Sequence, residues 1–132
     1  MSKRRMYIIM KINPYLSFGG NCAEAVMHYE KAFGVKATVE MCTQIKGNVA
    51  HAEFQLDGHT IMLFDSHEAV AQGDNVMLSI LFDKGDIIRA QKIFDALGAG
   101  GQIIMPMGKT DWSECFGLIK DKFGITWNMC QN

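Results

Sequence analysis

The sequence has almost no excess of charge, with 13 basic and 14 acidic residues among 132 and a formal net charge of -1. A chain that binds nucleic acid or an anionic membrane usually gathers basic residues into a positive field. We therefore expect neither a nucleic acid nor a membrane as a partner. No apolar run approaches the roughly 20 residues that a membrane-spanning helix needs.

Paired cysteine motifs are also missing. The four cysteines are widely spaced and form no CxxC motif. Basic residues precede a short apolar run near the start of the chain, but Lys11 ends this run before it reaches the length of a signal-peptide core. The cysteines are therefore predicted to be reduced thiols of a cytoplasmic protein. They are Cys22, Cys42, Cys115 and Cys130.

The sequence does contain an internal repeat. Two segments show the same order of patterns, and each opens with a strand-like run, at 12–18 and at 76–82, followed by a turn and a helix. With 48% hydrophobic residues, the whole chain is predicted to form one domain around a single core. The predicted organisation is an N-terminal extension at 1–10 and a single domain at 11–132, made of a module at 11–64, a linker at 65–75 and a module at 76–130.

The helix predicted in each half has a polar first residue, an apolar stripe and a glycine stop. The first helix follows Asn21, with Glu24 placed to reach back to the cap amide, and it ends at Gly34. The second helix follows Asp86 and ends at Gly98. The apolar stripes recur at helical spacing: Cys22, Ala25, Val26, Tyr29 and Phe33 in the first helix, and Ile87, Ala90, Phe94 and Leu97 in the second.

Three short strands are predicted after each helix, so that each half is a β-α-β-β-β module in an α+β fold. A four-stranded sheet covered by one helix leaves its other face open, which favours pairing with a second module. Two curved sheets joined side by side would leave a concave surface, where we expect a small-molecule ligand. The predicted strands are 36–45, 49–56 and 60–64 in the first half and 102–105, 115–120 and 125–130 in the second, with turns at 46–48, 57–59 and 121–124.

Paired modules of this kind resemble the vicinal oxygen chelate superfamily, which includes glyoxalase I, extradiol dioxygenases, and fosfomycin and bleomycin resistance proteins. The sequence is most similar to the PhnB-like branch. The matching segments are 12–16, 20–25, Tyr29, 33–34, 51–54, 105–107, Trp112, 116–117 and 121–127. The resemblance implies the glyoxalase/bleomycin-resistance fold of two paired βαβββ modules, and a homodimer whose cavities form partly across the subunit contact.

The PhnB-like domain is often labelled a 3-demethylubiquinone 3-methyltransferase type, and the sequence does not favour that activity. A nucleotide-derived methyl donor usually needs a glycine-rich turn from a strand into a helix. The run at 98–101 follows the second helix instead of preceding one, and Gly19-Gly20 is predicted to be a simple turn. We therefore expect no such cofactor.

The metal site of the superfamily is not retained in the sequence. In its metal enzymes, His or Glu residues on the first and last strands of each module typically hold a divalent ion. Methionine, proline, leucine and a neutral amide are not a ligand set for Mn, Ni or Fe. The residues at these positions here are Pro14, Met77 or Leu78, Met62 and Asn128. We expect no metal and no other cofactor.

Candidate site residues lie mainly on one predicted strand. His51, Glu53 and Gln55 alternate along it, so their side chains leave the same face. His51 could act as a general base oriented by Glu53, whereas a half-solvated sheet with polar residues outward is the simpler explanation. The resemblance favours a pocket lined by this row together with Met62, Asn128 and Trp112, the last in a predicted loop at 108–113.

Three hypotheses about function stay open at this point. The leading one is a small-molecule binding protein, or an enzyme of unknown reaction, without the inherited metal site. The second is a metal-dependent lyase, isomerase or dioxygenase with a rearranged site around His51 and Glu53. The third is a drug-sequestering resistance protein, for which only Glu53, Asp111 and Glu114 would supply acidic groups.

Overall fold

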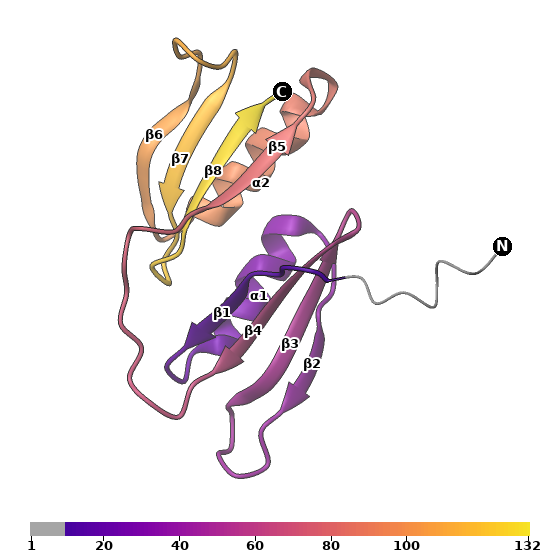
Figure 1. The fold of residues 1–132 in the computed structure, drawn as a ribbon, viewed down its shortest axis with the longest axis vertical. Helices are drawn as coiled ribbons and strands as arrows, with labels where there is room; N and C mark the ends of the chain where they lie inside the picture. Colours follow the sequence, from indigo (N-terminus) through magenta and orange to yellow (C-terminus); the bar gives the residue numbers. More distant parts are fainter. Residues whose placement is uncertain (1–9) are drawn as a thin grey trace, which may run out of the picture.

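The computed structural model describes residues 10–132 as two four-stranded sheets, each covered on one face by a helix (Figure 1). The expected extension at 1–10 lies outside the described residues except for Met10. The first module contains β1 (Tyr15–Phe18), α1 (Cys22–Phe33), β2 (Thr38–Met41), β3 (Val49–Leu56) and β4 (His59–Asp65). The second contains β5 (Leu78–Phe82), a 3-10 turn (Lys84–Asp86), α2 (Ile87–Gly98), β6 (Gln102–Gly108), β7 (Phe116–Lys120) and β8 (Thr126–Gln131). The predicted pair of βαβββ modules is confirmed.

The two sheets share one topology. Their strand orders are β1-β4-β3-β2 and β5-β8-β7-β6, and in each the first strand pairs in parallel with the last while the other pairs are antiparallel. The sheets are not hydrogen-bonded to each other; instead, α1 and α2 pack together in the middle of the molecule (Figure 1). The sequence-based expectation of two sheets joined side by side therefore does not hold within one chain.

Several strand ends differ from the prediction, although Val49–Leu56 matches it. The strands predicted to start at Ile12 and Val76 begin at Tyr15 and Leu78, and the one predicted at 36–45 is limited to 38–41. Pro14, which has no N–H to donate, precedes β1, and its carbonyl accepts from the Met62 amide at 3.0 Å. Irregular register also limits the edge strands β2 and β6.

The cap of α1 is not the one that the sequence predicts. Asn21 makes no side-chain hydrogen bond to the helix, and Glu24 pairs instead with Lys122 at 2.7 Å. The Asp65 carboxylate at the end of β4 accepts from the amides of Gly20 at 2.8 Å and Cys22 at 3.0 Å, and from Val49 at 2.8 Å. A buried anion from a distant strand thus binds the positive end of the helix.

The helix stops are predicted correctly in one module and displaced in the other. Gly34 ends α1 in the left-handed conformation, with φ 71°. In the second module, Gly98 is the last helical residue, and the left-handed position is Gly100, with φ 78°. The turns at Gly58 and Gly124 are equivalent as predicted, with φ of 86° and 89°. Within the predicted stripes, Ile87 is 40% exposed and lies outside the core.

A second buried carboxylate joins the two modules. Asp121, 3% exposed in the β7–β8 turn, accepts hydrogen bonds from the Tyr29 hydroxyl of α1 at 2.5 Å and the Trp127 indole at 2.9 Å. It also accepts from the amides of Phe123 and Ile125. A carboxylate can only accept when ionised, so four donors match its lone pairs. The contact ties the first helix to the second sheet.

Two buried groups make the fold sensitive to alkali. Burial, aided by the Asp65 carboxylate, raises the pKa of the Cys22 thiol from 9.0 to about 12. Burial, and to a smaller extent the Asp121 carboxylate, raises the pKa of the Tyr29 hydroxyl above its usual value. The folded chain keeps these protons where the unfolded chain has lost them. The free energy of unfolding is therefore undiminished below about pH 9 and falls as the pH rises toward 12.

Cys22→Ala should weaken this alkaline loss. We expect the free energy of unfolding of this variant to fall less steeply between pH 8 and pH 10.5 than that of the wild type, because one buried acid is removed. The difference between the two slopes should be at most about 1.4 kcal/mol per pH unit, the value for one proton. Urea unfolding followed by circular dichroism measures the slope. Cys42→Ala, at a half-buried position, is the control and should keep the wild-type slope. Equal slopes in all three proteins would contradict the assignment.

Candidate functional site

The first sheet carries a polar row on the face that α1 does not cover, which we call the first open face. Residues that pair across strands share a face, and the pairing joins Tyr15 to Met62 and Met62 to Glu53. Gln55 pairs with Thr60 in the same way. The buried side chains of Ala52 and Phe54 point to the helix side. The predicted row of His51, Glu53 and Gln55 therefore lies on the open face, and Met62 lies beside it.

A continuous chain of hydrogen bonds runs along this row. The Tyr15 hydroxyl lies 2.7 Å from Nδ1 of His51, and Nε2 of His51 lies 2.8 Å from Oε2 of Glu53. Gln55 donates to Glu53 at 3.5 Å and accepts from the Thr60 hydroxyl at 2.9 Å. The side chains of His51 and Glu53 are about one-third exposed, at 33% and 35%. The imidazole is thus held on both nitrogens while one side of the row meets solvent.

The partners of His51 define where its protons lie. An ionised carboxylate only accepts, so Nε2 donates to Glu53, and in the neutral ring Nδ1 then accepts from Tyr15. The Tyr15 oxygen keeps lone pairs for a ligand. When Tyr15 takes a proton from a ligand, it can pass its own proton to Nδ1, and Glu53 balances the imidazolium charge. The arrangement of Tyr15, His51 and Glu53, here called the proton relay, can remove a proton from a bound molecule.

The second sheet presents a less polar surface on its uncovered face, the second open face. Leu81, Cys130 and Phe116 pair across the strands, and so do Ser79, Asn128 and Leu118. The Ser79 hydroxyl donates to Oδ1 of Asn128 at 2.6 Å, and Nδ2 of Asn128 contacts the Met77 sulfur at 3.0 Å. Asn128 is only 8% exposed. Its amide is therefore satisfied within its own module.

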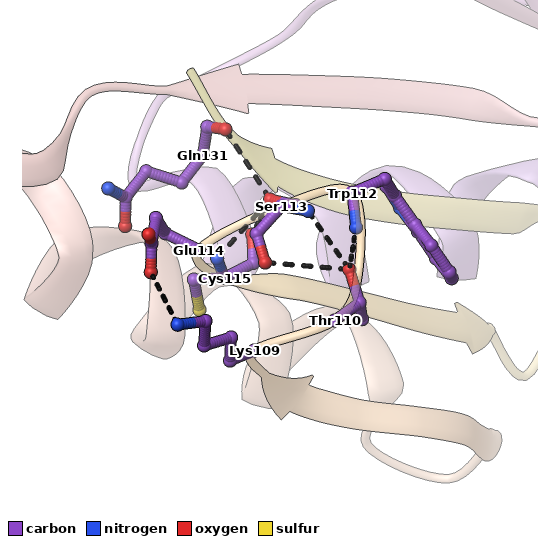
Figure 2. Close-up of polar contacts among 7 residues, drawn as sticks. All are labelled: Lys109, Thr110, Trp112, Ser113, Glu114, Cys115 and Gln131. Atoms are coloured by element: carbon purple, nitrogen blue, oxygen red, sulfur yellow. Dashed lines mark hydrogen bonds and ion pairs between the residues drawn. The ribbon is translucent and has the colours of Figure 1, made fainter.

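Trp112 projects from a tightly bonded loop at 109–115, and Figure 2 shows its indole pointing away from the loop's polar groups. The Thr110 hydroxyl accepts from the amides of Trp112 at 3.3 Å and Ser113 at 3.1 Å. The Ser113 hydroxyl donates to the Cys115 carbonyl at 3.0 Å. The indole is 66% exposed and lies edge-to-face with Phe116, with ring centroids 5.5 Å apart. Trp112 therefore forms a rim of the second open face, in the predicted loop.

Two pockets lie beside these faces and not over the predicted residues. The larger, of about 950 Å³, lies between β1, the linker at 66–76 and the start of β8, and Tyr15 lines it. The smaller, of about 540 Å³, lies between the β3–β4 turn and the β5–α2 region. None of the six predicted site residues lines either pocket.

The structure thus joins some predicted residues and separates others. It links His51, Glu53 and Gln55 by hydrogen bonds and places Met62 next to them. Asn128 lies on the other sheet, and Trp112 lies in the loop between β6 and β7 of that second module. Sequence reasoning missed Tyr15, which completes the proton relay from a position 36 residues away. The available signals were its alternation with Ser17 in a strand-like run and its place in the matching segment 12–16.

A divalent metal does not fit the inherited positions. In the first module, the residue of the first strand that shares a face with Met62 is Tyr15, and not the expected Pro14. In the second module, Met77 and Ser79 lie on the face of Asn128, and the alternative Leu78 does not. Thioethers, hydroxyls and one amide lack the charge and hardness that Mn, Ni or Fe ligands need. Among residues 10–132, no group of three His, Cys, Asp or Glu side chains could hold an ion.

The fold of this chain is defined by two equivalent βαβββ modules, each with one open sheet face. The family model described as the Glyoxalase/Bleomycin resistance protein/Dioxygenase superfamily matches residues 11–129. The chain belongs to this superfamily, as the resemblance of its sequence to the vicinal oxygen chelate proteins predicts.

Similar proteins cover nearly the whole chain. Protein YjdN of Escherichia coli is 28% identical over 137 residues, which span 89% of this chain and 92% of YjdN. The structure of a PhnB protein from Bacillus cereus, a proposed 3-demethylubiquinone-9 3-methyltransferase, is 26% identical with a TM-score of 0.78 and covers 93% of this chain and 100% of its own. Protein PA1353 of Pseudomonas aeruginosa is 28% identical, with a TM-score of 0.80 and coverages of 94% and 98%.

The turn before α1 is already occupied by a protein group. The amides of Gly20 and Cys22, which a phosphate would use at a helix N-terminus, donate to Asp65. Gly98, Gly100 and Gly101 lead out of α2 into β6, as predicted. Neither segment therefore offers a nucleotide-binding turn. In the part of the chain described, no helix is long and apolar enough to cross a membrane.

Proposed function

We propose that this chain is a cytoplasmic enzyme that removes a proton from a small organic molecule without a metal ion. The observation that carries the proposal is the unbroken proton relay from Tyr15 through His51 to Glu53 on the first open face. The ligand would approach the exposed Tyr15 ring, which is 49% accessible, and hydrogen-bond to its oxygen. Small carbonyl compounds with an acidic α-hydrogen are the substrate class that such a base serves.

The test is deuterium exchange. We expect the wild type to catalyse solvent exchange of the α-hydrogen in at least one member of a panel of small ketones and 2-oxo acids, followed by NMR. His51→Gln and Tyr15→Phe should each slow this exchange about 100-fold or more, which is the usual contribution of general base catalysis. Prior dialysis against a chelator should leave the rate unchanged.

The control for this experiment is His59→Gln, because His59 is an exposed histidine on β4 outside the relay. This variant should exchange at the wild-type rate. Exchange that survives in His51→Gln, or that disappears with the chelator, would contradict the proposal. Binding of a panel member without exchange would support the alternative of a binding protein.

We further propose that the chain acts as a homodimer, in which the first open face of one copy meets the second open face of the other. The first face is polar, whereas the second exposes Leu81 at 62% and Trp112 at 66%. Apolar side chains that are this exposed on a sheet face favour a covering partner. Such a dimer would give the proton relay an apolar opposite wall.

Leu81→Glu tests the dimer. A buried charge would oppose the contact, so we expect light scattering coupled to size exclusion to show a dimer for the wild type and a monomer for Leu81→Glu. Ile88→Glu, at a 73% exposed position on α2, is the matched control and should stay dimeric. A monomeric wild type at micromolar concentration, or a dimeric Leu81→Glu, would overturn this part of the proposal.

A further inference from the structure

The smaller pocket lies between the two modules, and no residue of the proton relay lines it. Its volume of about 540 Å³ is within the range of pockets that hold small molecules. The β3–β4 turn and β4 form one wall, and β5 and the first half of α2 form the other. Cavities between structural units are a common location of ligand sites. The pocket is therefore a candidate site apart from the relay.

The interior of this pocket is apolar. Trp127 and Met129 of β8 contribute to the lining and are each only 1% exposed. Three half-buried isoleucines come from three further elements: Ile61 of β4, Ile80 of β5 and Ile93 of α2. Apolar side chains of this kind gain free energy when hydrocarbon replaces water beside them. The interior thus favours an apolar group as the body of a ligand.

The charged side chains of the lining lie where the pocket opens to solvent, which we call the mouth. All four belong to exposed residues, namely Asp57, Asp83, Asp86 and Arg89. The Arg89 guanidinium lies 3.4 Å from the Asp57 carboxylate and can neutralise that one group. Asp83 accepts a hydrogen bond from the neutral amide of Asn132 at 3.1 Å, and Asp86 makes no cap hydrogen bond to α2. Two carboxylates are therefore left without a charge partner among these four residues.

The balance of charge at the mouth is negative. Three carboxylates less one guanidinium leave an excess of two negative charges, with His59 counted as neutral. The start of α2 adds a partial positive charge of about half a unit, which is too small to reverse this excess. A ligand carboxylate is therefore repelled and an ammonium group attracted. Because the groups are exposed, this effect is modest and decides mainly between ligands of opposite charge.

We infer that this pocket between the modules is a second ligand site, which binds a small amphiphilic amine. The hydrocarbon part lies in the apolar interior, and the ammonium group lies at the acidic mouth. A fatty acid would match the interior but not the mouth, and a small polar cation would match the mouth but not the interior. Leu81 lines the pocket and also belongs to the second open face, so binding is measured on the full chain in the oligomeric state that it adopts in solution.

The test compares n-octylamine with octanoate, which reverses the charge, and with n-butylamine, which shortens the hydrocarbon. NMR titration of the wild type at pH 7 should give a Kd for octylamine of about 1 mM or tighter, with shifts at the amides of Ile80 and Ile93. Octanoate should bind about fivefold more weakly. Each buried methylene adds up to about fourfold in affinity, so butylamine should bind at least about tenfold more weakly.

Asp57→Asn/Asp86→Asn removes the excess charge and keeps the shape of the mouth. Asparagine tolerates the left-handed backbone of residue 57, with φ 48°, and is a favoured residue before a helix. This variant should bind octylamine and octanoate within about twofold of each other. Asp74→Asn/Asp95→Asn is the matched control, because it also removes two carboxylates and one ion pair, at residues that do not line the pocket. It should keep the wild-type preference.

Several results would overturn the inference. One is equal binding of octylamine and octanoate by the wild type, and another is equal binding of octylamine and butylamine. A wild-type preference that survives in Asp57→Asn/Asp86→Asn, or no binding of octylamine at about 10 mM, would do the same. Shifts confined to Trp112 would place the amine on the second open face and would also contradict the proposed site. The comparisons on the wild type do not depend on the folding of any variant.

Discussion

Replacing Asp121 with alanine should lower the free energy of unfolding by about 4 kcal/mol, the largest effect that we expect from one substitution. The change leaves four donors without their acceptor, two of them on Tyr29 and Trp127, which are each 1% exposed. Each buried donor left unsatisfied costs about 1–3 kcal/mol, and water entering the space recovers part of this loss. The loss should also loosen α1 from the second sheet.

Urea unfolding followed by tryptophan fluorescence and by circular dichroism measures this loss. Asp121→Asn should lower the free energy of unfolding by about 2–3 kcal/mol. The remaining side-chain oxygen can still accept hydrogen bonds, but the new NH₂ group is itself a donor and faces other donors. Asp95→Ala is the control, since Asp95 is exposed on α2 and, among residues 10–132, its side chain accepts a hydrogen bond from Gln91 alone. This variant should change stability by less than about 0.5 kcal/mol. A loss for Asp121→Ala as small as that of the control would contradict the proposed connection.

Asp65→Ala should destabilise the fold by about 3 kcal/mol, the second largest effect. Asp65 accepts from three backbone amides, two of which belong to the start of α1. Without the carboxylate, the positive end of the helix and the Val49 amide would be buried without an acceptor. The midpoint of urea unfolding should therefore fall clearly below that of the wild type.

Asn21→Ala is an informative control for this effect. The sequence predicts Asn21 as the cap of α1, and a loss of about 1 kcal/mol would be usual for a true cap. Because its side chain makes no cap hydrogen bond in the structure, we expect almost no change. A larger loss for Asn21→Ala than for Asp65→Ala would restore the sequence-based cap and contradict the structural one.

Local patterns in the sequence predict most of the fold. Turn residues such as Gly58 and Gly124, and apolar spacing in both helices, mark element after element, because they depend on neighbours within a few residues. The prediction fails where a contact joins distant segments. Asp65 replaces the expected cap from 43 residues away, and Asp121 reaches Tyr29 across 92 residues. Neither spacing leaves a periodic trace in the sequence.

In the candidate site too, local patterns could be predicted from the sequence and contacts between distant segments could not. The alternation of His51, Glu53 and Gln55 is a property of one strand and could be predicted. Tyr15 joins them only because β4 lies between β1 and β3, which is a matter of sheet order. Asn128 and Trp112 were expected in the same pocket, but sequence alone cannot specify how two modules are placed relative to each other.

The irregular register of the edge strands affects how copies of this chain can meet. β2 contains four residues and a shift at Glu40, and β6 contains Pro106 and two shifts. Short, bulged or proline-containing edges resist the strand-to-strand addition through which sheet proteins aggregate. On these two edges, backbone pairing between molecules is therefore discouraged. Crowded solutions of the protein should favour contacts through side chains on the open faces over growth of extended sheets.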